Sequence, residues 1–172
     1  VAPDGRDAML QHSRDFAALG IPFVFDPGQN LPLFSKDELL TWIDQTTWCV
    51  MNDYESQLMM KITELTLDDI ASQVDALIVT RGAKGSRIYA GGKSIDIPAA
   101  SIEAAVDPTG CGDAFRAGLL YGLNGGWDWE TSGRAASLVG AFKVEQQGTQ
   151  NHHFTEDQFQ ARFEENFGYS LP

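Results

Sequence analysis

One short segment of the sequence combines the residue types that could bind a phosphate and accept a proton. Gly110, Cys111 and Gly112 stand immediately before Asp113, where a helical pattern follows. Glycines on both sides of a small residue let backbone N–H groups converge, and a helix beginning there adds the positive end of its dipole. A carboxylate beside such an anion site could take the proton of an attacking hydroxyl group. A tight loop with Asp113 as a helix N-cap fits the spacing equally well.

Two other glycine-rich phosphate motifs do not fit this sequence. A dinucleotide fingerprint would need a third glycine where Phe115 stands, and a strand before it with a ribose-binding acid downstream. The phosphate loop that ends in Gly-Lys-Ser would need glycine at Arg87, and Gly92-Lys93-Ser94 falls in a predicted hairpin instead of before a helix. Both mechanisms of phosphate binding are therefore excluded here.

Three segments together resemble the ribokinase-like (PfkB) kinases. Asp107–Gly118, with the sequence DPTGCGDAFRAG, resembles the C-terminal signature of that family. Asn52–Glu55 (NDYE) resembles its NxxE motif, and Thr80–Gly85 (TRGAKG) resembles its TxGxxG nucleotide loop, in the same order and at similar spacing. The resemblance implies an enzyme that transfers the γ-phosphate of ATP to a primary hydroxyl group of a small molecule.

The resemblance also implies roles for the residues of these segments. The N–H groups of Gly110, Cys111 and Gly112 would stabilise the charge that develops on the transferring phosphoryl group. Asp113 would accept the proton of the acceptor's hydroxyl group, where positioning counts for more than basicity. The residues expected to bind the nucleotide are Thr80, Gly82, Gly85, Ser137, Asn52 and Glu55.

Two cations enter through the same resemblance. Asn52 and Glu55 would support Mg²⁺ through its water ligands, because hard oxygen donors suit that ion. From the residues alone, the pair could equally be a helix start with Asn52 as its N-cap. A monovalent cation such as K⁺ would lie beside the anion-binding turn, held by Asp107, Thr109 and the segment 146–148.

The acceptor is expected to be a nucleoside, with adenosine favoured. Four short segments resemble bacterial-type adenosine kinases, namely DPGQ at 26–29, NDYE at 52–55, FRAG at 115–118 and GTQ at 148–150. Ser137 stands where ribokinase-type members often carry asparagine near the adenine pocket. A fructokinase-like or ribokinase-like sugar kinase, or a non-catalytic nucleotide-binding member of the fold, are the alternatives.

The elements around these motifs predict an α/β fold. Apolar runs predict strands at 21–25, 48–51 and 76–80, and a hairpin at 86–90 and 93–97. Helical patterns fall at 8–19, after a capping box at Ser35, from Asp53, at 67–74, 114–123, 130–146 and 155–167. Alternation of this kind predicts a ribokinase-like, doubly wound, mostly parallel sheet with flanking helices.

Composition limits the compartment and the partners. The 172 residues are 43% hydrophobic and carry a net charge of −12, which disfavours nucleic acid and anionic membranes as partners. Two cysteines and no long apolar run indicate a cytoplasmic protein. The resemblance implies that residues 1–172 are the C-terminal ATP-binding and catalytic part of a single kinase domain. An N-terminal substrate-binding and lid part, through which the protein would form a homodimer, is expected outside this sequence.

Overall fold

The structure is a computed structural model that describes residues 5–172. The chain forms two compact units. Of the described residues, the first unit holds those up to Arg81 together with Arg87–Ser94, and the second holds Gly82–Ser86 and Ile95–Pro172. Strands β4 (Ser86–Ala90) and β5 (Lys93–Ile97) contribute residues to both units.

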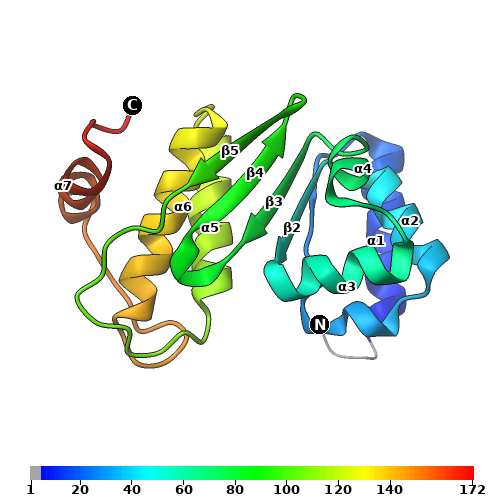
Figure 1. The fold of residues 1–172 in the computed structure, drawn as a ribbon, viewed down its shortest axis with the longest axis horizontal. Helices are drawn as coiled ribbons and strands as arrows, with labels where there is room; N and C mark the ends of the chain where they lie inside the picture. Colours follow the sequence, from blue (N-terminus) through cyan, green and yellow to red (C-terminus); the bar gives the residue numbers. More distant parts are fainter. Residues whose placement is uncertain (1–4) are drawn as a thin grey trace. The chain divides into compact units, whose positions relative to one another are not determined.

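The first unit alternates helices and strands, as the sequence predicts (Figure 1). In chain order, its first elements are α1 (Arg6–Leu19), β1 (Val24–Phe25), the 3₁₀ helix η2 (Gly28–Leu33), α2 (Lys36–Gln45) and β2 (Trp48–Asn52). These are followed by α3 (Asp53–Thr63), α4 (Leu67–Ala71) and β3 (Ala76–Thr80).

The strands form one five-stranded sheet in the order β1-β2-β3-β4-β5. β1 and β2 are parallel, and so are β2 and β3, in a register that pairs Trp48 with Ala76 and Asn52 with Thr80. Gly91 and Gly92, both with positive φ, form the turn between β4 and β5, which is typical of a two-residue hairpin. The predicted α/β sheet with flanking helices is confirmed, with a hairpin beside the parallel strands.

Helix ends follow the predicted capping chemistry. The capping box of Ser35 and Glu38 begins α2, and Gly20 ends α1 in the left-handed conformation. The strand predicted at 21–25 is shorter than expected, because the Ile21 N–H group donates to the Phe16 carbonyl oxygen as part of that helix end. Only Val24 and Phe25 remain free to pair with β2.

The core of the first unit covers one face of β2 and β3. Cys49 and Met51 lie beside Leu77 and Val79 in the register of the parallel pair, and all four are buried. The helices α1, α2, α3 and α4 each contribute a buried side chain to this cluster, including Leu10, Leu39, Met59 and Ile70. Burial of this apolar surface fixes the carboxyl ends of β2 and β3.

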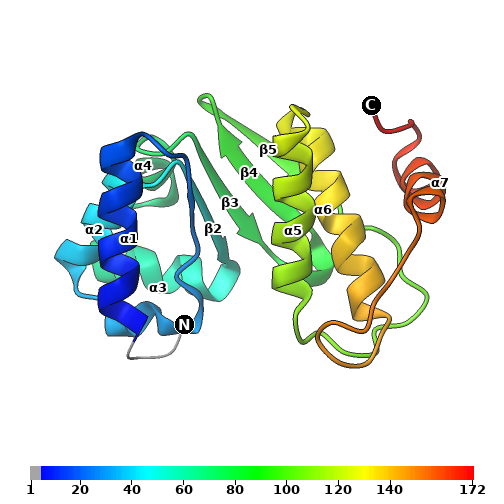
Figure 2. The same ribbon diagram turned by 180° about the vertical axis from the view of Figure 1, so that it is seen from behind.

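The second unit is built on α5 (Cys111–Asn124), α6 (Trp129–Val144) and α7 (Glu156–Phe167), with the 3₁₀ helix η3 (Gly82–Lys84). α5 and α6 lie side by side and antiparallel (Figure 2). They pack closely, since a Cβ at Gly118 would lie 2.8 Å from the Cα of Ala136. α7 packs on α6 through Phe159 and Phe163. Within residues 5–172, none of the helices has the length and apolarity that a membrane crossing requires.

Candidate functional site

The turn before α5, residues 107–113, is called the anion loop below. Its key backbone feature is Gly110, the N-cap of α5, which has φ +84° in the left-handed region. A Cβ at this position would also lie 3.0 Å from the Thr149 carbonyl oxygen. Both observations require glycine here, because other residues rarely adopt this conformation and none would fit beside Thr149.

Three N–H groups of the anion loop, those of Gly110, Gly112 and Asp113, are free to bind an anion. None of them donates to a group among residues 5–172, as the start of a helix allows. The Cys111 N–H, which was also predicted to contact the phosphoryl group, donates to the Pro108 carbonyl oxygen at 3.1 Å. Of the three predicted donors, Gly110 and Gly112 therefore keep a free N–H group, and Asp113 supplies a further one in place of Cys111.

Asp113 belongs to the first turn of α5, which begins three residues before the predicted start at 114. Its side chain is exposed and makes no hydrogen bond or ion pair with any residue of the described chain. The N-cap is Gly110, so the alternative in which Asp113 caps the helix does not describe this turn. A carboxylate without a structural partner, next to these free N–H groups, is available for chemistry.

Two neighbouring side chains complete the first turn of α5. A Cβ built on Gly112 would lie 2.6 Å from Nη1 of Arg116, so this guanidinium lies against the backbone of Gly112 and adds positive charge there. Burial raises the pKa of the Cys111 thiol, which opposes a nucleophilic role for this sulfur. Small size at a crowded turn, as the sequence indicates, explains cysteine better than reactivity does.

Asp107 links the anion loop to the segment after α6. Its Oδ1 accepts from the Thr109 N–H, and its Oδ2 accepts from the Gly148 N–H and from Nε2 of Gln147, each at 2.9 Å. The hydrogen bonds from Thr109 and Gly148, with a smaller contribution from the nearby charge of Lys143, lower the pKa of Asp107 to about 2. The carboxylate is therefore ionised throughout the physiological range and holds the two segments together.

Lys143 contacts the backbone of the anion loop at Asp107. The sequence did not predict a role for this lysine. It is fully buried in the last turn of α6, and its Nζ donates to the carbonyl oxygens of Asp107 at 2.6 Å and Gln146 at 3.1 Å. The only sequence signal was a lysine at the end of a mostly apolar helix, where interaction with the helix dipole is the ordinary explanation.

These contacts test the predicted K⁺ site. Carbonyl and carboxylate oxygens are suitable donors for such a cation, but here the carbonyl oxygens of Asp107 and Gln146 already accept from Lys143. Both carboxylate oxygens of Asp107 already accept from N–H groups. A carbonyl oxygen has two lone pairs, so these hydrogen bonds alone would leave room for a cation. A K⁺ bound to the same oxygens, however, would lie beside the buried ammonium group of Lys143. Because the two positive charges would repel each other, the residues present do not fit a bound K⁺.

Asn52 and Thr80, the first residues of the two remaining motifs, are paired in register at the carboxyl ends of β2 and β3. Asn52 and Glu55 form a complete capping box, with N–H to oxygen distances of 2.7 and 2.8 Å. Glu55 is only 6% exposed, and its Oε1 accepts no hydrogen bond from the described residues. The helix-cap interpretation is thus correct, and it leaves one hard oxygen donor unused.

Of the residues predicted to bind the nucleotide, Gly85 and Ser137 both contact the segment after β5 in the second unit. A Cβ at Gly85 would lie 2.0 Å from the Ile97 carbonyl oxygen, so this loop touches the segment after β5. Ser137 accepts from the Ala100 N–H at 2.8 Å and donates to the Pro98 carbonyl oxygen at 3.0 Å. Ser137 therefore anchors this segment to α6. Gly82, with φ +56°, begins the 3₁₀ helix η3 that precedes β4.

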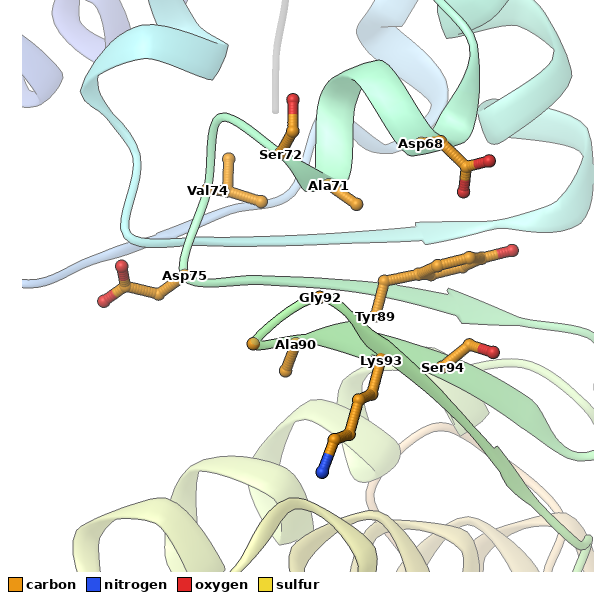
Figure 3. A pocket seen from close by; sticks show the side chains of 11 residues that line it. Asp68, Ala71, Ser72, Val74, Asp75, Tyr89, Ala90, Gly92, Lys93 and Ser94 are labelled. Atoms are coloured by element: carbon orange, nitrogen blue, oxygen red, sulfur yellow. The ribbon is translucent and has the colours of Figure 1, made fainter.

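The first unit also contains a pocket of about 700 Å³ at the opposite end of β3 (Figure 3). It lies between α4 and the β4–β5 turn, with Asp75, Tyr89 and Lys93 among its lining residues, and Lys93 points away from α4. None of the predicted site residues lines it. Ligands of parallel sheets bind at the carboxyl ends of strands, whereas this pocket lies at the other end of β3.

Comparison with solved structures identifies a near relative. The nucleoside kinase of Burkholderia thailandensis, solved in complex with inosine, is 49% identical and superposes with a TM-score of 0.95, over 96% of this chain and 55% of that one. The same enzyme has been solved with ADP and inosine.

Sequence comparison agrees with the structural one. A nucleoside kinase of Methanocaldococcus jannaschii is 41% identical over 142 residues, which are 83% of this chain and 47% of that protein. The adenosine kinase of Saccharomyces cerevisiae is 24% identical over 163 residues, 86% of this chain and 47% of that protein. The chain thus spans about half the length of the curated relatives it matches. Residues 1–156 match the family described as pfkB family carbohydrate kinase, and the chain belongs to this family.

Proposed function

We propose that this chain is the ATP-binding and catalytic part of a nucleoside kinase, which transfers the γ-phosphate of ATP to a primary hydroxyl group. The observation that carries the proposal is Asp113, an exposed carboxylate without a partner in the described chain, beside the free N–H groups of the anion loop. Membership in the PfkB family and similarity to nucleoside kinases support it.

The chemistry follows from the two kinds of group at the turn. Asp113 receives the proton of the acceptor's hydroxyl group as the oxygen attacks the γ-phosphorus, and the bond from this phosphorus to the bridging oxygen breaks to release ADP. The N–H groups of Gly112 and Asp113 donate to the phosphoryl oxygens, on which negative charge accumulates in the transition state. Fixed backbone dipoles need no reorientation during the reaction, so they stabilise this charge more than mobile water would.

Mg²⁺ would be supported by Glu55 and Asn52. Glu55 offers an oxygen that no residue of the described chain uses, and a carboxylate suits this hard cation, which keeps most of its water ligands. When bound, Mg²⁺ neutralises charge on the phosphates of ATP. The capping box holds the Glu55 carboxylate in place, because its other oxygen is fixed by the Asn52 N–H.

The acceptor is proposed to be a nucleoside instead of a free sugar. The Burkholderia thailandensis relative binds inosine, and it is far more similar to this chain than the yeast adenosine kinase is. A purine base offers a large stacking surface that ribose and fructose lack. Adenosine remains the specific acceptor that the four short sequence matches favour.

The test is an ADP-release assay with the whole protein and Mg·ATP over inosine, adenosine, guanosine, ribose, fructose and fructose phosphates. We expect kcat/KM for the best nucleoside to exceed that for every sugar by at least ~10-fold, which is ~1.4 kcal/mol of transition-state binding. A preference for inosine over adenosine would refute the adenosine prediction alone. A preference for any sugar would refute the nucleoside assignment, and no ADP release with any acceptor would refute the kinase assignment.

A further inference from the structure

The buried ammonium group of Lys143 has an unusual set of partners. Charged groups are rarely buried without a counter-charge in direct contact, because removing them from water is costly. Lys143 is 0% exposed, yet its Nζ donates to two neutral carbonyl oxygens, those of Asp107 and Gln146. The carboxylate of Asp107 supplies a compensating negative charge nearby, and its own oxygens accept from N–H groups.

These two carbonyl groups belong to the segments that shape the anion loop. The N–H groups of Val106 and Asp107 donate to the Val144 carbonyl oxygen at 2.8 and 3.0 Å, so the chain before the loop is hydrogen-bonded to the end of α6. The carbonyl oxygen of Thr149 lies close to Gly110, at 3.0 Å from a Cβ built on that glycine. Lys143 thus connects the first residue of the anion loop to the segment 146–149. The same segment contacts Gly110 through Thr149.

A group in this position determines where the free N–H donors point. Asp107 is the fixed start of the loop, and Gly112 and Asp113 follow within one turn of chain. If the Asp107 carbonyl group were released, the loop could rotate, and donors must lie at about 2.7–3.1 Å from the developing oxyanion to stabilise it. An ammonium group and K⁺ carry the same charge, have nearly the same size and bind the same oxygen atoms.

We propose that Lys143 replaces a monovalent cation in this protein, as a positioning residue that holds the anion loop by its own ammonium group. The effect on catalysis rests on the proposed function, whereas the replacement of the cation can be tested on the stability of the folded chain alone. With Lys143 in this position, we expect neither the stability nor the activity of the protein to depend on K⁺, in contrast to the K⁺ site that the family resemblance implies. If Lys143 only stabilised the end of α6, K⁺ would not restore a variant that lacks its ammonium group.

The test removes the ammonium group and asks whether K⁺ can take its place. Lys143→Met keeps the length of the side chain and leaves the carbonyl groups of Asp107 and Gln146 without their ammonium donor, so its Tm in tetramethylammonium chloride should fall by about 4–8 °C. At the same ionic strength, KCl or RbCl should restore at least half of this loss, and LiCl should not. The parent protein should have the same Tm in all these salts.

The matched control is Lys61→Met, which removes an exposed lysine from the last turn of α3. Its Tm should change little, and equally in every salt. With the whole protein, K⁺ should also raise the kcat of Lys143→Met at least ~10-fold towards the parent value while KM for ATP changes less.

The outcomes separate this inference from the kinase proposal. A Tm or kcat of the parent that rises with K⁺ would overturn the replacement, and this arm holds even if Lys143→Met does not fold. If Lys143→Met folds and loses the same stability in every salt, Lys143 does not replace a cation and only stabilises the end of α6. If no kinase activity is found, the Tm measurements still decide whether Lys143 stands in for the cation.

Discussion

Gly85 and Ile97 approach so closely that no side chain can stand between them. A Cβ at Gly85 would lie 2.0 Å from the Ile97 carbonyl oxygen, and φ of Gly85 is +78°. The nearby Gly82 also has a positive φ, +56°, but a Cβ there would meet nothing within 4 Å. The two glycines of the TxGxxG segment are therefore required for different reasons.

Gly85→Ala should destabilise the protein more than Gly82→Ala does. The Gly82 substitution adds only the cost of a left-handed backbone, about 1–2 kcal/mol, whereas the Gly85 substitution adds an overpacking cost of about 1–3 kcal/mol to it. Urea unfolding of the two variants beside the parent measures the difference in the free energy of unfolding. Equal losses in the two variants would show that the loop does not contact the Ile97 carbonyl group.

Glu55→Gln should weaken the response to Mg²⁺ more than it weakens folding. The glutamine oxygen can still accept from the Asn52 N–H, as Gln158 does in the capping box of α7, but the negative charge is lost. We expect the Mg²⁺ concentration for half-maximal rate to rise about 10-fold or more, with a smaller change in KM for the acceptor.

The control for this variant is Glu38→Gln, which makes the same change in the capping box of α2. Its Mg²⁺ titration should coincide with that of the parent protein. If the Glu55→Gln titration also coincides with it, Asn52 and Glu55 serve only to begin α3.

The low pKa of Asp107 predicts a pH-dependent loss of stability. Because this pKa falls from its usual 3.8 to about 2 on folding, the ionised carboxylate favours the folded state above pH ~4, and this contribution disappears as the pH falls towards 2. Asp107→Asn should remove this part of the acid sensitivity. Unfolding curves of parent and variant between pH 2 and about 5 should therefore converge at low pH. Parallel curves would contradict the hydrogen bonds assigned to Asp107.

Much of the fold could be predicted because its signals are local. Capping boxes at Ser35 and Asn52, the glycine at the end of α1 and the apolar run of β3 each act within a few residues, and each element lies where the sequence predicts it. The strand before Asp26 was overestimated because its first residues are used to end α1. The start of α5 was placed too late because no side chain caps that helix.

The parts of the site that could not be predicted depend on contacts distant in sequence. Lys143 reaches Asp107 across 36 positions, and nothing in the residues around either one shows that they meet. The same is true of the contacts of Ser137, whose hydroxyl group is hydrogen-bonded to the backbone of Pro98 and Ala100. A motif identifies the residues of a site, whereas the hydrogen bonds around it determine which of their groups are free.

The most direct measurement of the central claim is the turnover of Asp113→Asn in the whole protein, beside its affinity for ATP. Asparagine keeps the size of the side chain and breaks no hydrogen bond seen in the described chain. The Tm should therefore stay within a few degrees of the parent value, and the Kd for ATP within a few-fold. The rate of ADP release with inosine or adenosine should fall at least ~10²-fold, because a general base contributes about that much. A variant that turns over at nearly the parental rate would contradict the account.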